Sequence, residues 1–494
     1  MKRLADNLAH AFDQRPESFF LVVLAVQAVL WFLAPVLTYS NAPVDIVENL
    51  AWGREWQLGY ASHPPLQAWL SMGAVWLAGN AIWPIFVLSQ IAMALTYLPL
   101  YLLGREAGGA RVGLFAVLIF SLVFYANWPT PEFNANVLQM PIWAFATWEL
   151  WRAIKTERLI WWLTFGFTCA LAAYAKYSAV ILFAALFLAS VAIPEGRRAY
   201  RTVGPYLAVA LALALLVPHL WWLWSADFLP IRYVEDRAGR PEGFDRITRL
   251  LSFSGAQILD HLLPAVVLLA SGIGFRSINR QPLADRSLWR FILVMAFAPY
   301  AVTLLFALLS GYGLRDMWAA PMPIWISLVA AILFLPVVRR LPGFLFTWAV
   351  AFALLPVLLG VVTVASRDFP HPLWAAWPGS AMADALGAAW KQNTGGAPLR
   401  IAAGDRLSAG LMGALYPEHP HVMTRADFRL SPWITPEELE RDGALFVWYY
   451  NPFDGVPPEY TKFGPFKAIG TVQIRFPGPD SAAIGWAVKA PAGR

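Results

Sequence analysis

The chain has 494 residues, of which 59% are hydrophobic and only 14% are charged, and it contains 25 Trp and 32 Phe. Soluble domains average about 25% charged residues, so this composition excludes an ordinary soluble protein and indicates one that buries apolar surface in lipid. The net charge of +6 requires no nucleic-acid partner, because basic loops beside anionic lipid account for it. A single cysteine, Cys169, excludes an internal disulfide and a cysteine-based zinc site.

Apolar runs of about 17 to 22 residues, the length that crosses a bilayer as a helix, recur along the first three quarters of the chain. The first run, near 18–38, is not followed by a small-residue cleavage site, so we expect a retained helix rather than a signal peptide. The sequence predicts eleven spans: 18–38, 82–103, 112–127, 135–151, 159–175, 177–193, 203–224, 254–275, 291–309, 321–338 and 343–365.

Every second connection between the spans is basic. These connections are 104–111, 152–158, 194–201, 276–290 and 337–342, and together they hold 14 Lys or Arg against four Asp or Glu. This bias predicts that they face the cytoplasm together with the N-terminus. The opposite connections, which are 39–81, 128–134, 175–177, 225–253 and 310–320, then face outward. An odd number of spans puts the C-terminal segment outside as well.

The segment from residue 366 contains no apolar run long enough to cross a membrane. The stretches "PLRIAAGD", "ALFVWYYN" and "AAIGWAVKA" predict strands, and "TPEELERDG" predicts a helix with Thr435 as its N-cap and Gly443 at its end. The sequence therefore predicts a membrane domain at 1–365 and a small extracytoplasmic α/β domain at 366–494.

Charged residues crowd into "NAPVDIVENLAWGREWQLGYASHPPLQAWL", residues 41–70. At helical spacing Asp45, Glu48, Trp52 and Glu55 share one face, so 43–58 predicts an amphipathic helix on the outer membrane surface. The prolines of "HPPL" end it, and "QAWLSMGAVWLAG" predicts a second interfacial helix. The acids could form a solvated face, but carboxylates beside membrane entry points are costly unless they are used.

This stretch resembles the first outward loop of the GT-C glycosyltransferases that use polyprenyl-phosphate sugars. They include the protein O-mannosyltransferases and bacterial enzymes that transfer aminoarabinose, galacturonic acid or hexosamine to lipopolysaccharide. Their pattern is an acidic residue on a juxtamembrane helix, an aromatic residue or Gly-Tyr, a basic residue, and prolines before a tryptophan. The matching residues are Asp45, Gly59, Tyr60, His63, Pro64, Pro65 and Trp69. Weaker matches are Glu132 in "NWPTPEFNAN" and Lys176 in "AAYAKYSAV".

The resemblance covers most of residues 18–365. It implies the GT-C fold and an inverting transfer of a sugar from a lipid phosphate. Asp45 is the implied catalytic base, with Glu48 beside it, and Tyr60 and Glu132 are implied substrate-binding residues.

The resemblance also implies that His63 and Lys176, on the outward side, hold the phosphate. Some members carry lysine where this chain has His63. A histidine is only partly charged near neutral pH, so this position departs from the pattern.

Some bacterial members bind a metal between an acidic residue just before this basic position and a histidine on a later helix. Here Ser62 and His219 occupy the two positions. Half of the pair is missing, so the sequence predicts neither that metal site nor any certain cofactor, and it leaves a divalent cation open. His219 is then a histidine at the membrane interface or a substrate-binding residue.

The outward connection 225–253 holds five Arg and five Asp or Glu, and its two glycines around a proline predict a mobile loop. The loop is a solvated connector or a lid in which Arg237 or Arg240 grips an anionic donor or acceptor. Arg315, in "GYGLRDMWAAP", adds a cation on the same side, where it binds substrate or anchors the chain at the interface.

The favoured function is a multi-pass glycosyltransferase of a bacterial inner membrane that modifies an envelope lipid or glycan at the periplasmic face. Its partners are a polyprenyl-phosphate sugar, a lipid or glycan acceptor of the lipid A or lipopolysaccharide type, and membrane lipids. The alternative is a transporter or flippase of lipid-linked sugars, which typically shows inverted repeats and broken midplane helices. The sequence shows neither feature. A structural scaffold would not need charges on four outward loops.

Overall fold

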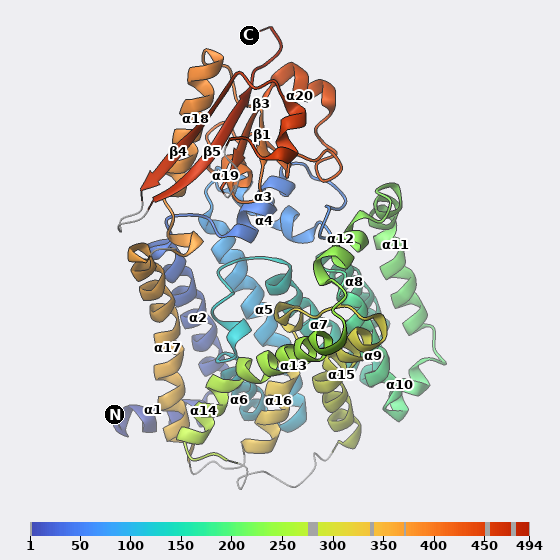
Figure 1. Ribbon diagram of the computed structural model, residues 1–494. Helices are drawn as coiled ribbons and strands as arrows, with labels where there is room; N and C mark the ends of the chain where they lie inside the picture. The colour runs from blue at the N-terminus through green and yellow to red at the C-terminus, as the bar shows by residue number, and fades with distance from the viewer. Residues whose placement is uncertain are drawn as a thin grey trace. The chain divides into compact units, whose positions relative to one another are not determined.

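The computed structural model describes residues 2–274, 285–335, 340–369, 372–449, 455–475 and 481–493. The chain forms two compact units (Figure 1). The first comprises Met1–Leu33, Ser62–Leu66 and Val87–Val357, and the second comprises Ala34–Ala61, Gln67–Phe86 and Leu358–Arg494. This division differs from the predicted boundary at 365, because most of the first outward loop folds with the C-terminal residues.

The first unit is helical, and each predicted span overlaps a described helix. The helices that lie wholly or mainly in this unit are α1 (Lys2–Gln14), α2 (Pro16–Thr38), α5 (Trp83–Gly108), α6 (Ala110–Phe120), α7 (Ala135–Thr156), α8 (Leu159–Ala175), α9 (Ala179–Val191), α10 (Pro194–Ala199), α11 (Gly204–Ser225), α12 (Leu229–Ala238), α13 (Gly243–Asp260), α14 (Leu262–Ala270), α15 (Arg286–Ser310), α16 (Pro323–Phe334) and α17 (Leu341–Ala365). The predicted span 254–275 is broken, because α13 and α14 meet at an angle of 41°.

Five of the described helices are long and apolar enough to cross a membrane: α2, α5, α11, α15 and α17. The number rises to six if the bent pair of α13 and α14 is one broken span. The protein is therefore a multi-pass membrane protein. Four other predicted spans, α6, α8, α9 and α16, have only 11 to 17 residues, so length and composition do not establish all eleven.

The backbones of α8 and α11 approach each other closely at two small residues. A Cβ atom added to Gly166 of α8 would lie 2.4 Å from the carbonyl oxygen of Ala208 in α11. Only glycine permits this approach, which is the small-residue packing typical of membrane helices.

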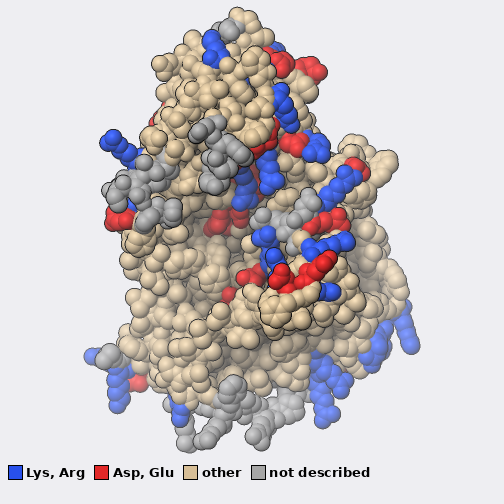
Figure 2. Space-filling model, viewed as in Figure 1, with Lys and Arg blue, Asp and Glu red and all other residues tan. Residues whose placement is uncertain are grey.

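Four of the five connections predicted to face the cytoplasm meet one another or the N-terminal segment within the first unit. Four contacts join them: Arg111 to Asp13 at 3.0 Å, Arg152 to Glu106 at 3.0 Å, Lys155 to Asp285 at 2.9 Å, and Ser287 to Glu195 at 2.8 Å. These segments therefore lie at one end of the helical unit, as the alternation of basic connections predicts. Figure 2 shows mostly uncharged surface over the helices and a group of basic side chains over α10.

The prediction of a mobile loop at 225–253 is wrong for most of this segment. It forms α12 and the first part of α13, and only residues 239–242 join them. Apolar residues at helical spacing, including Phe244, Ile247 and Leu251, give α13 an amphipathic sequence. The side chain of Arg237 lies outside the described residues, so its proposed role in a lid stays a prediction.

The second unit contains a five-stranded sheet in the order β2-β1-β3-β5-β4. Its strands are β1 (Ile401–Gly404), β2 (His421–Thr424), β3 (Ala444–Trp448), β4 (Ala468–Arg475) and β5 (Ser481–Lys489). β2, β1 and β3 are parallel, whereas β5 pairs antiparallel with β3 and with β4. The sequence predicted β1, β3 and β5 and missed β2 and β4.

Helices cover both faces of this sheet. On one face α18 (Gly379–Thr394) and α19 (Ser408–Leu415) pack against side chains such as Leu445 and Val447. On the other, α20 (Pro436–Asp442) packs against Phe446. The predicted cap of α20 is confirmed, because Thr435 and Glu438 form a reciprocal capping box. Burial on both faces explains the continuous apolar runs of β1 and β3.

The predicted surface helix at 43–58 is shorter and more enclosed than expected. It is α3 (Val44–Gly53), and α4 (Leu66–Leu77) follows it. Val47 of α3 contacts Gly410 of α19, and a Cβ on Gly53 would lie 2.6 Å from the carbonyl oxygen of Ala68. α3 therefore packs within the second unit, and Glu55 lies beyond its end.

Candidate active site

The two predicted catalytic acids, Asp45 and Glu48, are one turn apart on α3, and both face Arg406. The Nη1 atom of Arg406 lies 3.2 Å from Oε2 of Glu48 and 3.9 Å from Oδ1 of Asp45. The side chain of Glu48 is 13% exposed, whereas that of Asp45 is 35% exposed. Glu48 is thus the more enclosed partner, and Asp45 keeps more of its carboxylate accessible.

Arg406 is positioned by the turn that follows β1. The carboxylate of Asp405 accepts hydrogen bonds from the backbone N–H groups of Leu407 and Ser408 at 2.8 and 2.9 Å, which caps the start of α19. Its second oxygen accepts the N–H of Tyr449, just after β3. A Cβ on Gly404 would lie 1.9 Å from the carbonyl oxygen of Val447. The turn is therefore tied to two strands and a helix.

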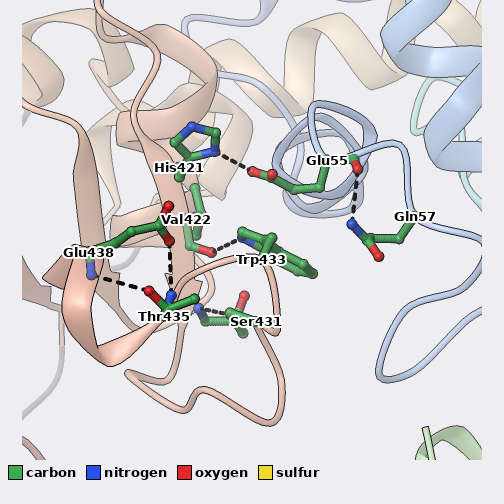
Figure 3. Close-up of polar contacts among 9 residues, drawn as sticks. Glu55, Gln57, His421, Val422, Ser431, Trp433, Thr435 and Glu438 are labelled. Atoms are coloured by element: carbon green, nitrogen blue, oxygen red, sulfur yellow. Dashed lines mark hydrogen bonds and ion pairs between the residues drawn. The ribbon is translucent and has the colours of Figure 1, made fainter. Parts of the chain in front are cut away.

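Glu55, just after α3, contacts the sheet of the same unit. Its Oε1 lies 2.8 Å from Nδ1 of His421 on the edge strand β2, as Figure 3 shows. This hydrogen bond raises the pKa of His421 above the ordinary value of 6.5. Glu55 is 6% exposed and His421 is 58% exposed, so the pair sits at the rim of the sheet.

Tyr60 is buried within the second unit. Its ring is 1% exposed and stacks on Trp52 at 5.2 Å with an interplanar angle of 8°. The ring centres of Tyr60 and Trp433 are 6.3 Å apart, and the two ring planes are inclined at 77°. Burial raises the pKa of the Tyr60 hydroxyl. The structure gives Tyr60 an aromatic packing role, and its binding of substrate stays a prediction.

In the first unit, Lys176 occupies the turn between α8 and α9. Its side chain is 9% exposed, and its ammonium group donates a hydrogen bond to Oδ1 of Asn136 in the first turn of α7. Ser178 donates to Gln139 at 2.7 Å on the same helix. A lysine this enclosed needs polar partners, and the start of α7 supplies one.

His219 of α11 lies against the same turn. It is 3% exposed and stacks on Tyr177 at 5.9 Å, on Trp222 at 5.8 Å and beside Tyr174 at 5.5 Å. Because Tyr177 directly follows Lys176, the structure brings His219 to the turn that carries the predicted phosphate-binding cation.

The remaining predicted residues, Glu132 and His63, both belong to the first unit. Glu132 lies two residues before Asn134, whose side chain caps α7, and it is partly buried. His63, also partly buried, lies in the bend before α4, in a segment grouped with the first unit. The joining of these residues with Asp45 in one site stays a prediction.

Two predicted outward segments of the first unit do meet. Arg240 donates a hydrogen bond to the hydroxyl of Tyr312 at 3.2 Å, and Tyr312 donates to Glu235 at 2.6 Å. The guanidinium of Arg240 also lies 5.0 Å from the centre of the Tyr312 ring. Arg315 lies partly buried just before a short 3-10 helix at Asp316–Ala319. Substrate binding by Arg240 and Arg315 stays a prediction.

Among the described residues, no group of three or more His, Cys, Asp or Glu side chains could hold a metal ion. We therefore assign no metal ligands within these parts of the chain.

Sequence reasoning missed Arg406. The available signal was its position: it follows a buried strand, "RIAAGD", and precedes a helix. Side chains at the carboxyl ends of parallel strands commonly face ligands or functional groups in α/β folds.

Comparisons with known proteins agree with this architecture. Residues 62–222 match the family described as dolichyl-phosphate-mannose-protein mannosyltransferase. The chain is similar to the lipopolysaccharide core galacturonosyltransferase RgtB of Rhizobium johnstonii, with 23% identity over 466 residues that cover 91% of each chain. The lipid A galacturonosyltransferase RgtD of the same organism is 26% identical over 245 residues, 49% of this chain and 51% of the relative.

The fold is similar to the crystal structure of ArnT from Cupriavidus metallidurans bound to undecaprenyl phosphate. The TM-score is 0.63 at 13% identity, and the match covers 95% of this chain and 98% of that one. The helical membrane unit, the small C-terminal sheet and these matches define a GT-C fold. The chain is a multi-pass membrane glycosyltransferase of this fold.

Proposed function

We propose that the protein transfers galacturonic acid from a polyprenyl-phosphate donor to lipopolysaccharide at the periplasmic face of a bacterial inner membrane. The observation that carries this proposal is the similarity to RgtB, a lipopolysaccharide core galacturonosyltransferase, over 91% of both chains. The fold likeness to an ArnT structure bound to undecaprenyl phosphate supports the choice of lipid donor.

In the proposed reaction, an acceptor hydroxyl attacks the anomeric carbon of the donor sugar. The bond between that carbon and the phosphate oxygen breaks, and its electron pair leaves with the polyprenyl phosphate. Asp45 accepts the hydroxyl proton, while Lys176 and His63 bind the departing phosphate. Attack opposite the leaving group inverts the anomeric configuration.

Purified protein in lipid nanodiscs tests the proposal directly. With undecaprenyl-phosphate galacturonic acid and lipopolysaccharide, we expect mass spectrometry to show one added galacturonic acid per acceptor and an equal amount of released undecaprenyl phosphate. The matched donor control carries mannose on the same lipid. The function would be refuted if lipopolysaccharide stayed unmodified in this assay and also lacked the modification in cells with the gene as in cells without it.

A further inference from the structure

A polar cavity of about 500 Å³ opens within the second unit, at the amino ends of the parallel strands β1 and β2. Its lining includes Arg400 before β1, His421 of β2, Trp433, and Glu438 and Arg441 of α20. Figure 3 shows His421, Trp433 and Glu438 around this region. The acids of α3 contact Arg406 after β1, at the opposite end of that strand.

Trp433 gives the cavity a fixed aromatic wall. Its indole N–H donates to the carbonyl oxygen of Val422 at 3.3 Å, and its ring meets Tyr60 edge-on at 6.3 Å. These contacts fix the indole, which is only partly buried. An indole that is packed against protein at one end and exposed to solvent at the other suits ligands with both apolar and polar faces. A pyranose ring is such a ligand.

The acidic groups of the lining already have partners. Glu438 accepts the N–H of Thr435 in the capping box at 3.0 Å. Asp442 accepts two hydrogen bonds from Arg441, at 3.1 and 2.8 Å. Glu418 lies 3.5 Å from Lys391. These carboxylates are therefore compensated without a ligand.

Arg400 is an exposed cation of the lining. Among the described residues its guanidinium forms no direct ion pair, and its charge helps to lower the pKa of Asp442 nearby. Its backbone carbonyl accepts the N–H of His421 at 2.9 Å, which places the two basic residues beside each other. A guanidinium at a cavity mouth is suited to a carboxylate or phosphate because it can donate two parallel hydrogen bonds.

We infer that this cavity binds an anionic sugar of the acceptor, with the pyranose ring on Trp433 and its carboxylate or phosphate on Arg400. The inference rests on the proposed function, because it takes the acceptor to be a glycan. It assigns the C-terminal sheet a role in acceptor recognition that is separate from proton transfer at α3.

The test uses the full-length protein in nanodiscs and measures sugar binding by isothermal titration. The probes are digalacturonic acid, the neutral disaccharide galactobiose, galactose 6-phosphate and inorganic phosphate. We expect the acidic sugars to bind and galactobiose to bind at least tenfold more weakly. R400Q should weaken binding of the acidic sugars at least tenfold, and W433F should weaken it a few-fold while keeping the ring that packs on Tyr60.

The matched control is R429Q, which removes an exposed arginine of the same unit that pairs with Asp427 at 3.0 Å and does not line the cavity. It should leave binding unchanged. Digalacturonic acid and galactose 6-phosphate distinguish a carboxylate from a phosphate as the anionic group. Unchanged affinity in R400Q, equal binding of galactobiose, or equal binding of inorganic phosphate alone would overturn the inference.

Failure of this inference and failure of the proposed function give different results. If the wild type modifies lipopolysaccharide but binds none of the acidic sugars, the cavity is not an acceptor site and the transferase function stands. If acidic sugars bind through Arg400 but no lipopolysaccharide is modified, the cavity stands as a binding site for acidic sugars, and the proposed function and the assignment of that sugar to the acceptor fail.

Discussion

Arg406 donates to Glu48 across 358 residues of sequence and lies near Asp45. An ion pair between side chains that remain partly exposed contributes at most about 1 kcal/mol to stability. Its larger effect is therefore expected on geometry, because a carboxylate that acts as a base must be held within reach of its proton. We regard Arg406 as a positioning residue of α3.

The substitution R406Q separates the two effects. We expect the free energy of unfolding to change by less than about 1 kcal/mol, while kcat falls about tenfold because Asp45 loses a neighbour that orients it. KM for the donor should stay within a few-fold. R406K should recover part of kcat, since it restores the positive charge but lacks the planar guanidinium that can donate two parallel hydrogen bonds. A kcat equal to wild type in R406Q would leave Arg406 with a structural role only.

Asp45 itself is tested by D45N, which keeps the size of the side chain and removes its charge. Loss of a general base typically lowers turnover by about 10² or more, so we expect single-turnover rates to fall by that factor while the donor still binds. The control is D384N, which changes an exposed aspartate on α18 of the same unit. Turnover within a few-fold of wild type would remove Asp45 from the mechanism.

The local elements were predictable where a few adjacent residues determine them. The cap at Thr435 and the strands β1 and β3 follow from neighbouring residues, and the structure contains them. The length of α3 was not predictable, because its end at Gly53 depends on contact with α4. β2 was missed because four residues, "HVMT", carry too little pattern to separate a strand from a loop.

The turn between α8 and α9 is the element on which donor binding is expected to depend. Lys176 is enclosed there, and if it binds the donor phosphate, K176M should weaken donor binding by about 1.5–3 kcal/mol, the range for a charge-assisted contact. The measurement is the dissociation constant of the polyprenyl-phosphate sugar in nanodiscs. The control is K155M, because Lys155 pairs with Asp285 among the predicted cytoplasmic segments.

An unchanged dissociation constant in folded K176M would show that Lys176 only ties the turn to Asn136. H63K belongs to the same experiment. Lysine occupies this position in some of the enzymes that the sequence resembles, so we expect donor affinity to persist.

The edge strand β2 provides a pH-dependent contact. The hydrogen bond to Glu55 raises the pKa of His421, so the folded state binds the proton more tightly than the unfolded state. The resulting stability is fully present below the ordinary histidine pKa of about 6.5 and is lost as pH rises through the raised value. The Tm of wild type should therefore exceed that of H421Q by about 1–3 °C at pH 6. The two should agree at pH 9.

At the scale of the whole molecule, composition and basic connections predicted a multi-pass protein, and the motif at 41–70 indicated the correct fold. The site was only partly predictable. Sequence spacing places Asp45 beside Glu48, but it cannot show that a residue beyond the last span, Arg406, contacts both. Contacts of this kind arise from tertiary packing and leave no local pattern. The same limit applies to His219, which meets Tyr177 only because α8 and α11 pack closely.

The orientation of the helical unit in the membrane can be tested by labelling. Four of the five predicted cytoplasmic connections meet at one end of the helical unit, and the excess of positive charge in the connections predicts that this end faces the cytoplasm. In a C169S background, R198C and R429C each carry one exposed cysteine, on α10 and in the C-terminal segment respectively. A maleimide that cannot cross membranes should label R429C in intact spheroplasts and should label R198C only after permeabilisation. The reverse pattern would place the C-terminal sheet in the cytoplasm and would separate it from any acceptor in the periplasm.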